Sequence, residues 1–195
     1  MRIISGSARG RKLCPPPLHD RSIRPTSDRA REALFNILGN RVEGARVLDL
    51  FAGTGAFGLE ALSRDARLVV FVDHSPLSLK LIRKNIQLCR KGFSGECAVQ
   101  VIKHDLTRNL PISKLTRESL SGFDLIFVDP PYSKNISLSV LDFLNKSSLL
   151  TASGLLVVEE RHNVELPLEF STFQCSDKRT YGETAFYFYQ RSNTI

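Results

Sequence analysis

The chain has 195 residues, of which 42% are hydrophobic and 24% charged, a composition typical of a soluble globular protein. This length favours a single domain with at most a small appendage. No apolar run approaches the roughly 20 residues of a membrane-spanning helix, and the opening MRIISGSARGRK lacks the apolar core of a signal peptide. We therefore expect a cytoplasmic protein with no membrane partner.

The charge is unevenly distributed along the chain. The net charge is +7, and residues 1–46 carry ten Arg or Lys against four Asp or Glu, whereas the remainder carries seventeen against sixteen. A basic segment on a nearly neutral domain favours a polyanionic partner such as nucleic acid. The same charge could alternatively form a solubilising surface.

The cysteines and histidines give no sign of a metal site. The four cysteines form no CxxC pair and the four histidines form no ligand cluster. We expect reduced thiols and no bound metal.

The first predicted elements are a hairpin and a helix. Two short β-like runs, at residues 3–4 and 12–13, flank a basic turn that contains Gly6 and Gly10, and Pro15 begins the proline run that ends this hairpin. Capping residues at 26–28 then precede an apolar stripe with helical spacing, which predicts an amphipathic helix ending near Gly39. The stripe consists of Ala30, Ala33, Leu34, Ile37 and Leu38.

From Arg46 onward, strands and helices alternate. Apolar runs predict strands at 46–51, 68–72, 98–102, 123–128 and 154–158, with helices at 57–63, 76–90 and 136–145. This alternation implies a parallel sheet covered on both faces. Residues 170–174 and 185–190 predict an antiparallel hairpin around a turn that contains Gly182, which would complete a mixed sheet.

The stretch DLFAGTGAFG, residues 49–58, has the spacing of a nucleotide-binding loop. Gly53, Gly55 and Gly58 follow a predicted strand and open a predicted helix, and Asp73 ends the next strand twenty residues beyond Gly53. Glycines let a ligand approach the backbone closely, and an acidic residue at this distance can accept hydrogen bonds from both ribose hydroxyls. The alternative is a plain tight turn.

Asp49 bears on which cofactor this loop would hold. It places a carboxylate beside the glycine loop, where NAD would bring an anionic pyrophosphate and like charges would repel. S-adenosylmethionine instead brings an ammonium and a sulfonium, which a carboxylate attracts. Asp49 therefore favours S-adenosylmethionine, although it could also be a structural cap of the loop.

A second motif follows the fourth predicted strand, which runs directly into Asp129-Pro130-Pro131-Tyr132. Ligands of open α/β sheets bind at the carboxyl ends of strands, so this loop should face the same crevice as the glycine loop. The Asp129 side chain and the Pro130 carbonyl could accept the two N–H bonds of an exocyclic amine on a nucleobase, with Tyr132 stacked on the base. The alternative is a proline-rich turn without function.

These motifs give the chain a full-length resemblance to a known family. It resembles the class I S-adenosylmethionine-dependent methyltransferases with a [D/N]PP[Y/F] signature, and more closely the RsmD family of 16S ribosomal RNA guanine-N2 methyltransferases. The resemblance is carried by MRIISGSARGRKL, RPTSDRAREALFNIL, VLDLFAGTGAFGLEALSR, FDLIFVDPPY and the segment from Tyr181 to Arg191.

The resemblance implies a Rossmann-like α/β fold with a mostly parallel seven-stranded sheet and an antiparallel C-terminal hairpin. It also implies two parts of the chain, a small basic N-terminal hairpin extension at residues 1–24 and a methyltransferase domain at 25–195.

The resemblance assigns a role to each site residue. Asp49, Gly53 and Gly55 would hold the methionine part of the cofactor, Asp73 its ribose, and Asp105 with Leu106 its adenine. Asp129, Pro130 and Tyr132 would hold the target base, and the hairpin residues Arg9, Arg11 and Lys12 would bind RNA.

The chain departs from the family in two places. The first is Asp73, which stands where the family usually has glutamate. The second is a long polar loop at 108–121, which leaves open that Asp105 is only a helix cap.

We expect a monomer that acts on 16S ribosomal RNA or the small ribosomal subunit.

Three alternatives remain. The same chemistry could act on adenine N6 or another amine. The chain could be an RNA-binding assembly factor that has lost activity. An NAD-dependent oxidoreductase would need an acid/base set for hydride transfer, which the sequence does not offer.

Overall fold

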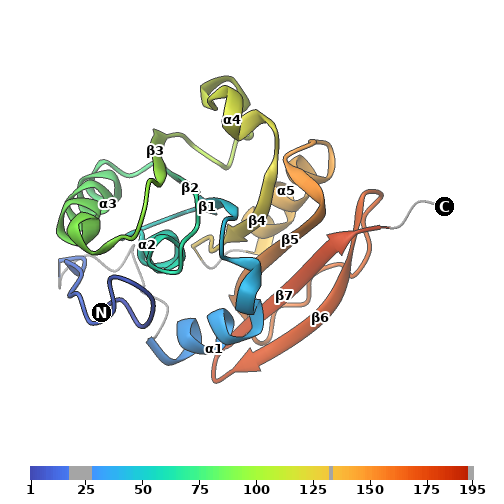
Figure 1. Ribbon diagram of the computed structural model, residues 1–195. Coiled ribbons are helices and arrows are strands. Elements are labelled where there is room, and N and C mark those ends of the chain that lie inside the picture. The colour runs from blue at the N-terminus through green and yellow to red at the C-terminus, as the bar shows by residue number, and fades with distance from the viewer. Residues whose placement is uncertain (18–27, 132–133, 193–195) are drawn as a thin grey trace.

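The structure is a computed structural model that describes residues 1–17, 28–131 and 134–192. Its centre is a seven-stranded sheet in the order β3-β2-β1-β4-β5-β7-β6 (Figure 1). The first five strands are parallel, and β7 runs antiparallel to both β5 and β6. The strands are β1 (Arg46–Leu50), β2 (Leu68–Asp73), β3 (Ala98–Lys103), β4 (Phe123–Val128), β5 (Leu150–Arg161), β6 (Phe173–Tyr181) and β7 (Thr184–Arg191).

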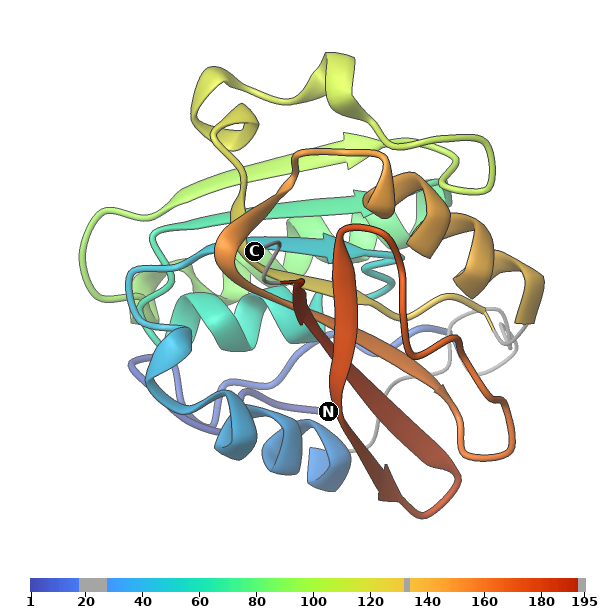
Figure 2. The same cartoon turned by 90° about the vertical axis from the view of Figure 1, so that its right-hand side faces the viewer.

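Helices cover both faces of the sheet (Figures 1 and 2). One hydrophobic cluster joins the N-terminal residues, α1 (Asp28–Leu38), α2 (Ala56–Ser63) and α3 (Pro76–Cys89) to one face of the sheet. A second cluster joins α5 (Lys134–Asn145) to the other face. The short elements are α4 (Arg117–Leu120) and the 3₁₀ turns η1 (Gly39–Arg41), η2 (Arg90–Gly92) and η3 (Ile112–Lys114). The expected Rossmann-like α/β fold is thus confirmed.

Burial explains why β2 was easy to find in the sequence and β6 was not. All six residues of β2 are buried, as expected for a parallel strand covered on both faces. The edge strand β6 is mostly polar and has one buried residue, Phe173; it spans Phe173–Tyr181, where the sequence predicted 170–174. The predicted bounds were wrong because most of β6 is polar and no apolar run marks it, whereas the antiparallel hairpin itself is confirmed. β5 likewise extends beyond the predicted 154–158 at both ends.

The N-terminal hairpin is smaller than two strands but firmly packed. It closes with one antiparallel bridge between Arg2 and Lys12, and the Ile3 amide donates to the Arg11 carbonyl at 3.0 Å. Its side chains Ile3, Ala8 and Leu13 are buried in the same cluster as α2. Residues 1–17 therefore share the core of the main domain, and the proposed boundary at residues 24 and 25 lies outside the described residues.

Helix α2 anchors the hairpin through polar groups. The buried Glu60 carboxylate accepts from the amides of Ile4 at 2.7 Å and Ser5 at 2.9 Å. Gly6 has a φ of +78°, and a Cβ there would lie 1.7 Å from the Ser63 carbonyl oxygen. Only glycine therefore allows the turn to pack against α2 in this way.

All four cysteines are free thiols. In the part of the chain that the structure describes, no helix combines the length and the apolar character needed to cross a bilayer.

Candidate functional site

The register of the sheet brings the predicted site residues to one edge of the sheet, where the parallel strands have their carboxyl ends. Leu50 of β1 pairs with Val72 of β2 and with Val128 of β4, so the three strands end level. The loops that follow therefore start side by side, and they bond to neighbouring strands. The Ala52 amide donates to the Val72 carbonyl at 3.1 Å, and the Asp129 amide donates to the Leu50 carbonyl at 3.3 Å.

The glycine loop makes its turn with left-handed residues. Gly53 has a φ of 55° and Gly55 a φ of 78°, and the Gly55 amide donates to the Ala52 carbonyl at 2.7 Å. Phe51 also has a positive φ, of 60°. A non-glycine residue in this region costs about 1–3 kcal/mol, and such strain is concentrated at ligand sites. No sequence signal marked Phe51.

Packing opposes a side chain at two of the three glycines. A Cβ at Gly58 would lie 2.3 Å from the Phe71 ring, so this glycine lets α2 pack against β2. A Cβ at Gly55 would lie 3.3 Å from side-chain atoms of both Ile82 and Phe71. Substitution at Gly55 is therefore opposed by its positive φ and by crowding from behind the loop.

Asp49 is a buried carboxylate at the end of β1, with 1% of its surface exposed. One of its oxygens, Oδ2, accepts from the Gly58 amide at 3.0 Å, so Asp49 does cap the first turn of α2. Burial raises the pKa of Asp49 to about 7; the Gly58 hydrogen bond opposes this rise, and the charge of Asp73 adds to it. The ionised form would therefore be stabilised by a nearby cation.

Asp73 connects the glycine loop to the start of α3. Its Oδ2 accepts from the Gly53 amide at 2.9 Å, and its Oδ1 accepts from the Ser75 amide at 2.8 Å. Each carboxylate oxygen has a second lone pair, so Asp73 can still accept from hydroxyl groups. The short side chain thus reaches the backbone of the loop directly.

Asp105 follows β3 at the same edge and forms a turn cap. It accepts from the Thr107 amide at 3.1 Å and the Thr107 hydroxyl at 2.6 Å, and Arg108 Nε lies 3.3 Å from its Oδ2. The hydrogen bond from the Thr107 hydroxyl is the main cause that lowers the pKa of Asp105. The Leu106 side chain is buried in the core, which leaves only its backbone for a ligand.

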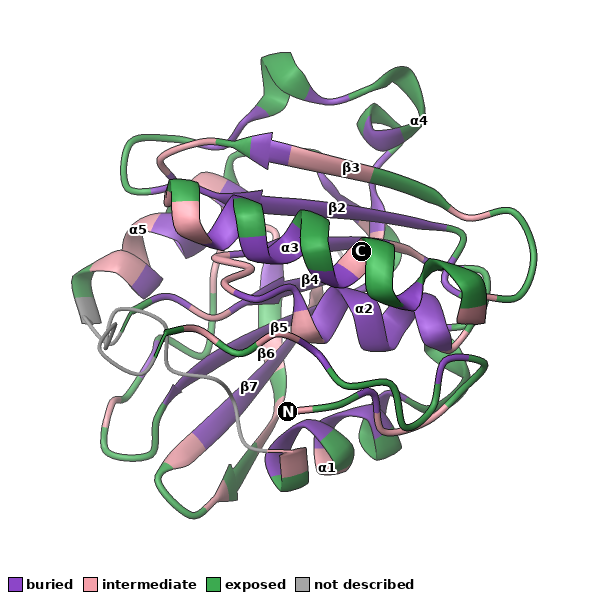
Figure 3. Ribbon diagram, turned by 90° about the vertical axis from the view of Figure 1, so that its left-hand side faces the viewer, coloured by how far each residue is buried: buried purple, intermediate pink, exposed green. Residues whose placement is uncertain are grey.

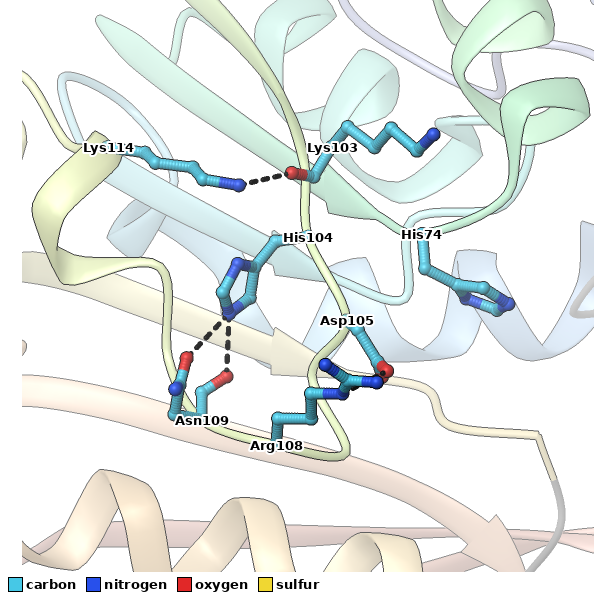
Figure 4. Close-up of a pocket in the computed structure, with 7 residues that line it drawn as sticks. All are labelled: His74, Lys103, His104, Asp105, Arg108, Asn109 and Lys114. Atoms are coloured by element: carbon cyan, nitrogen blue, oxygen red, sulfur yellow. Dashed lines mark hydrogen bonds and ion pairs between the residues drawn. The ribbon is translucent and has the colours of Figure 1, made fainter.

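A cavity of about 480 Å³ opens beside Asp105 (Figure 4), within the usual size range of small-molecule sites. Hydrogen bonds hold the polar loop over the end of β3. Lys114 Nζ donates to the Lys103 carbonyl at 2.7 Å, and His104 Nε2 lies 2.8 Å from Asn109 Oδ1. The sequence did not reveal this cavity, because it forms only where a loop without periodicity folds back over the ends of β2 and β3. Its lining residues are His74, Lys103, His104, Asp105, Arg108, Asn109 and Lys114.

The structure describes two of the three residues expected to hold the target base. Asp129 is half-buried and Pro130 is buried, whereas Tyr132 lies outside the described residues. Phe127, two residues earlier in β4, stacks on Phe57 of α2 with ring centroids 4.0 Å apart. This packing fixes the end of β4 relative to the helix that follows the glycine loop.

The expected RNA-binding residues are separate from this edge. Arg9, Arg11 and Lys12 are exposed on the hairpin. Arg11 Nη1 donates to the Leu88 carbonyl at 3.2 Å, near the C-terminal end of α3. Ser75 and the glycine loop lie at the other end of that helix. Arg11 therefore holds the hairpin against α3, a role that the sequence did not indicate.

Asn85 is a further residue that the sequence analysis missed. It is fully buried on α3, where its Oδ1 accepts from the Cys14 amide at 2.7 Å and its Nδ2 donates to the Thr54 carbonyl at 2.9 Å. This side chain joins the hairpin to the glycine loop. A signal was present in the sequence, because Asn85 stands between Ile82 and Cys89 on the apolar stripe of the helix.

In the described ranges, no cluster of three or more His, Cys, Asp or Glu side chains is suited to hold a metal ion.

Comparisons with known proteins agree over nearly the whole chain. The family model described as conserved hypothetical protein 95 matches residues 1–190. YlbH of Bacillus subtilis is 36% identical over 191 residues, which cover 98% of this chain and 99% of that protein. Ribosomal RNA small subunit methyltransferase D of Escherichia coli is 30% identical over 191 residues, which cover 98% of this chain and 90% of that protein.

Two solved structures also resemble the chain over nearly its full length. The Escherichia coli protein yhhF is 30% identical and superposes with a TM-score of 0.76, covering 98% of each chain. The Haemophilus influenzae protein HI0767 is also 30% identical, with a TM-score of 0.71 over 97% of each chain.

Proposed function

Because this chain belongs to the RsmD family of ribosomal RNA small subunit methyltransferases, we propose that it methylates the exocyclic N2 amine of a guanine in 16S ribosomal RNA. At the level of the family, the chain is an RNA methyltransferase. The observation that carries the proposal is the level ending of β1, β2 and β4. It brings Asp49, the glycine loop, Asp73 and Asp129 to one edge of the sheet.

The residues at this edge fit S-adenosylmethionine as the cofactor. The pKa of Asp49 is raised by burial, and a cationic ammonium and sulfonium nearby would stabilise its ionised form. We assign Asp49, Gly53 and Gly55 to the methionine part, Asp73 to the ribose hydroxyls, and Asp105 with the Leu106 backbone to the adenine. When bound, the cofactor supplies a methyl group made electrophilic by the sulfonium.

Asp129 and Pro130 are proposed to orient the target amine. The lone pair of such an amine is delocalised into the ring, so the amine is a poor nucleophile unless it is positioned. The Asp129 carboxylate and the Pro130 carbonyl accept its two N–H bonds and direct the nitrogen towards the methyl carbon. Productive geometry requires the reacting atoms to be about 3–3.5 Å apart. Tyr132 stacks on the base.

Substrate choice rests on charge and on the family. The basic hairpin, with Arg9, Arg11 and Lys12, favours a polyanion. Guanine is favoured over adenine by family membership alone. The N2 amine lies on the minor-groove side of a base pair, so the base must be unpaired or flipped before it can enter the site. We propose that a monomer acts on 16S ribosomal RNA or on the small subunit.

The decisive experiment combines labelling with nucleoside analysis. Small subunits and 16S ribosomal RNA from a strain that lacks the gene are incubated with the protein and methyl-labelled S-adenosylmethionine, and the nucleosides are separated by mass spectrometry. We expect label in N2-methylguanine, and none with Asp129→Ala. Label in N6-methyladenine would refute the guanine assignment. Cofactor binding without any transfer would favour the inactive assembly factor.

A further inference from the structure

Helix α3 and the turn after it carry a basic face that the net charge of residues 47–195 does not reveal. Residues 74–95 contain five Lys or Arg and no Asp or Glu, although the whole chain has 20 acidic residues in 195. The local excess is balanced by acidic residues elsewhere, so residues 47–195 are nearly neutral in sum. All five cations are exposed: Lys80, Arg83, Lys84, Arg90 and Lys91.

These cations occupy the outer side of the helix. Lys80 and Lys84 are four residues apart and so lie on the same side, while Leu79, Ile82 and Cys89 are buried on the inner side. The 14 residues of α3 extend over about 21 Å. Figure 3 shows the exposed side of α3 on the outer surface of the molecule.

The five charges on this face are not neutralised by ion pairs within the described part of the chain. Ion pairs between described residues neutralise cations in several other elements, namely Arg31, Arg46, Arg64, Arg108, Lys178 and Arg179. Within the same described part of the chain, no ion pair includes any of the five cations of α3 and η2. Like charges spaced three or four residues apart destabilise a helix, and a bound polyanion would relieve that repulsion.

The face continues into the N-terminal hairpin. Arg11 donates to the Leu88 carbonyl, and Cys14 donates to Asn85, so the hairpin lies against the C-terminal half of α3. A Cβ at Gly92 would lie 2.6 Å from Arg11 Nε and 3.1 Å from the Ala8 Cα, so glycine permits this close approach. Figure 1 shows the hairpin, in blue, beside α3.

We propose that one basic surface, formed by the outer side of α3, η2 and the hairpin, binds the phosphate backbone of the RNA substrate. This α3–hairpin surface consists of Arg9, Lys12, Lys80, Arg83, Lys84, Arg90 and Lys91, and the hydrogen bond from Arg11 to the Leu88 carbonyl joins its two parts. The inference rests on the proposed methylation of RNA.

The surface also has a direction. Its hairpin end lies at the C-terminus of α3, and its other end lies at Ser75, which is bonded to the same Asp73 carboxylate as the glycine loop. An RNA strand bound along α3 would therefore extend towards the end of the sheet where Asp129 lies.

The test removes two charges from α3 alone. Lys80→Gln with Lys84→Gln keeps side-chain length and helix propensity. Its matched control is Arg117→Gln with Lys146→Gln, which removes two exposed charges, one from α4 and one from the residue that follows α5. Binding of transcribed 16S ribosomal RNA is measured over a series of salt concentrations, and S-adenosylhomocysteine binding is measured by calorimetry.

We expect the α3 variant to bind RNA more weakly and to lose about 1.4–1.8 from the slope of log affinity against log salt, since each phosphate contact contributes roughly 0.7–0.9. Its KM for RNA should rise with kcat unchanged, and cofactor affinity should be unchanged. The control should keep the wild-type slope. An unchanged slope in the α3 variant, or an equal loss in the control, would overturn the inference.

The two proposals fail separately. If the wild-type protein methylates 16S ribosomal RNA and the α3 variant keeps the full salt slope, only the α3–hairpin surface is refuted. If the slope falls as expected but the wild-type protein transfers no methyl group, the surface stands as an RNA-binding surface and the proposed activity is refuted.

Discussion

Replacing Asp49 with asparagine should separate the stability of the fold from its affinity for the cofactor. In Asp49→Asn the new side-chain amide oxygen can still accept the Gly58 hydrogen bond, while the negative charge disappears. At about 1.4 kcal/mol per pH unit, raising the pKa of Asp49 from 3.8 to about 7 costs the folded protein about 4 kcal/mol at pH 8.

The sign of this effect follows from the direction of the pKa change. Because the pKa is higher in the folded state, the stability associated with protonated Asp49 is fully present below about pH 4 and is lost as the pH rises through about 7. Asp49→Asn should remove that loss. At pH 8 the variant should gain up to about 4 kcal/mol, reduced by about 1–3 kcal/mol if its buried amide nitrogen finds no acceptor. At pH 4 it should gain nothing.

Cofactor binding should respond in the opposite direction. Loss of the carboxylate should weaken S-adenosylmethionine binding by roughly 10- to 100-fold, as expected for a hydrogen bond to a charged group. In the wild-type protein the affinity should rise between pH 5 and 7 as Asp49 ionises, with release of a proton on binding. The variant should lack this pH dependence. Calorimetry in buffers of different ionisation enthalpy measures both quantities.

Asp124→Asn is the matched control, measured by urea unfolding at pH 4, 6 and 8. Partial burial alone would raise the pKa of Asp124, but its hydrogen bonds and ion pair with Arg46 outweigh burial and lower it. Its contribution to stability is therefore present above the unfolded-state pKa and is lost as the pH falls through the folded-state value. This variant should be less stable than wild type at pH 8. The reasoning about Asp49 would be refuted if Asp49→Asn were destabilised in the same way.

Three further substitutions test other parts of the site. Asp129→Ala should abolish methyl transfer with cofactor affinity retained, and Asp129→Asn should retain part of the activity because its amide oxygen still accepts; wild-type turnover in Asp129→Ala would exclude the proposed clamp. Gly58→Ala should lower the free energy of unfolding by about 1–3 kcal/mol, since its Cβ would lie 2.3 Å from the Phe71 ring, and unchanged urea unfolding would contradict this packing. Asn85→Ala should cost about 2–4 kcal/mol and weaken cofactor binding, because it leaves the Thr54 carbonyl and the Cys14 amide without their partner; calorimetry that shows wild-type affinity would mean that Asn85 supports only the fold.

The sequence by itself determined the class of fold, the family and the strand-end motifs. Parallel strands buried on both faces require long apolar runs, so β1, β2 and β4 were visible as such. Glycines at 53, 55 and 58 and the prolines at 130 and 131 impose local backbone geometry, which depends on residue type alone. For the same reason, the turn at Gly182, which has a φ of 62°, was predicted correctly.

Only the tertiary structure decided how these pieces act on one another. The level ending of three strands follows from hydrogen-bond register between segments far apart in the chain. The capping by Asp49, the two amides held by Asp73 and the link that Asn85 makes between hairpin and glycine loop all join distant backbone groups. The basic side of α3 gains its continuation only because the hairpin packs beside it. Periodicity reports the environment of each residue along its own element, whereas these contacts depend on which elements become neighbours, and long-range packing alone determines that.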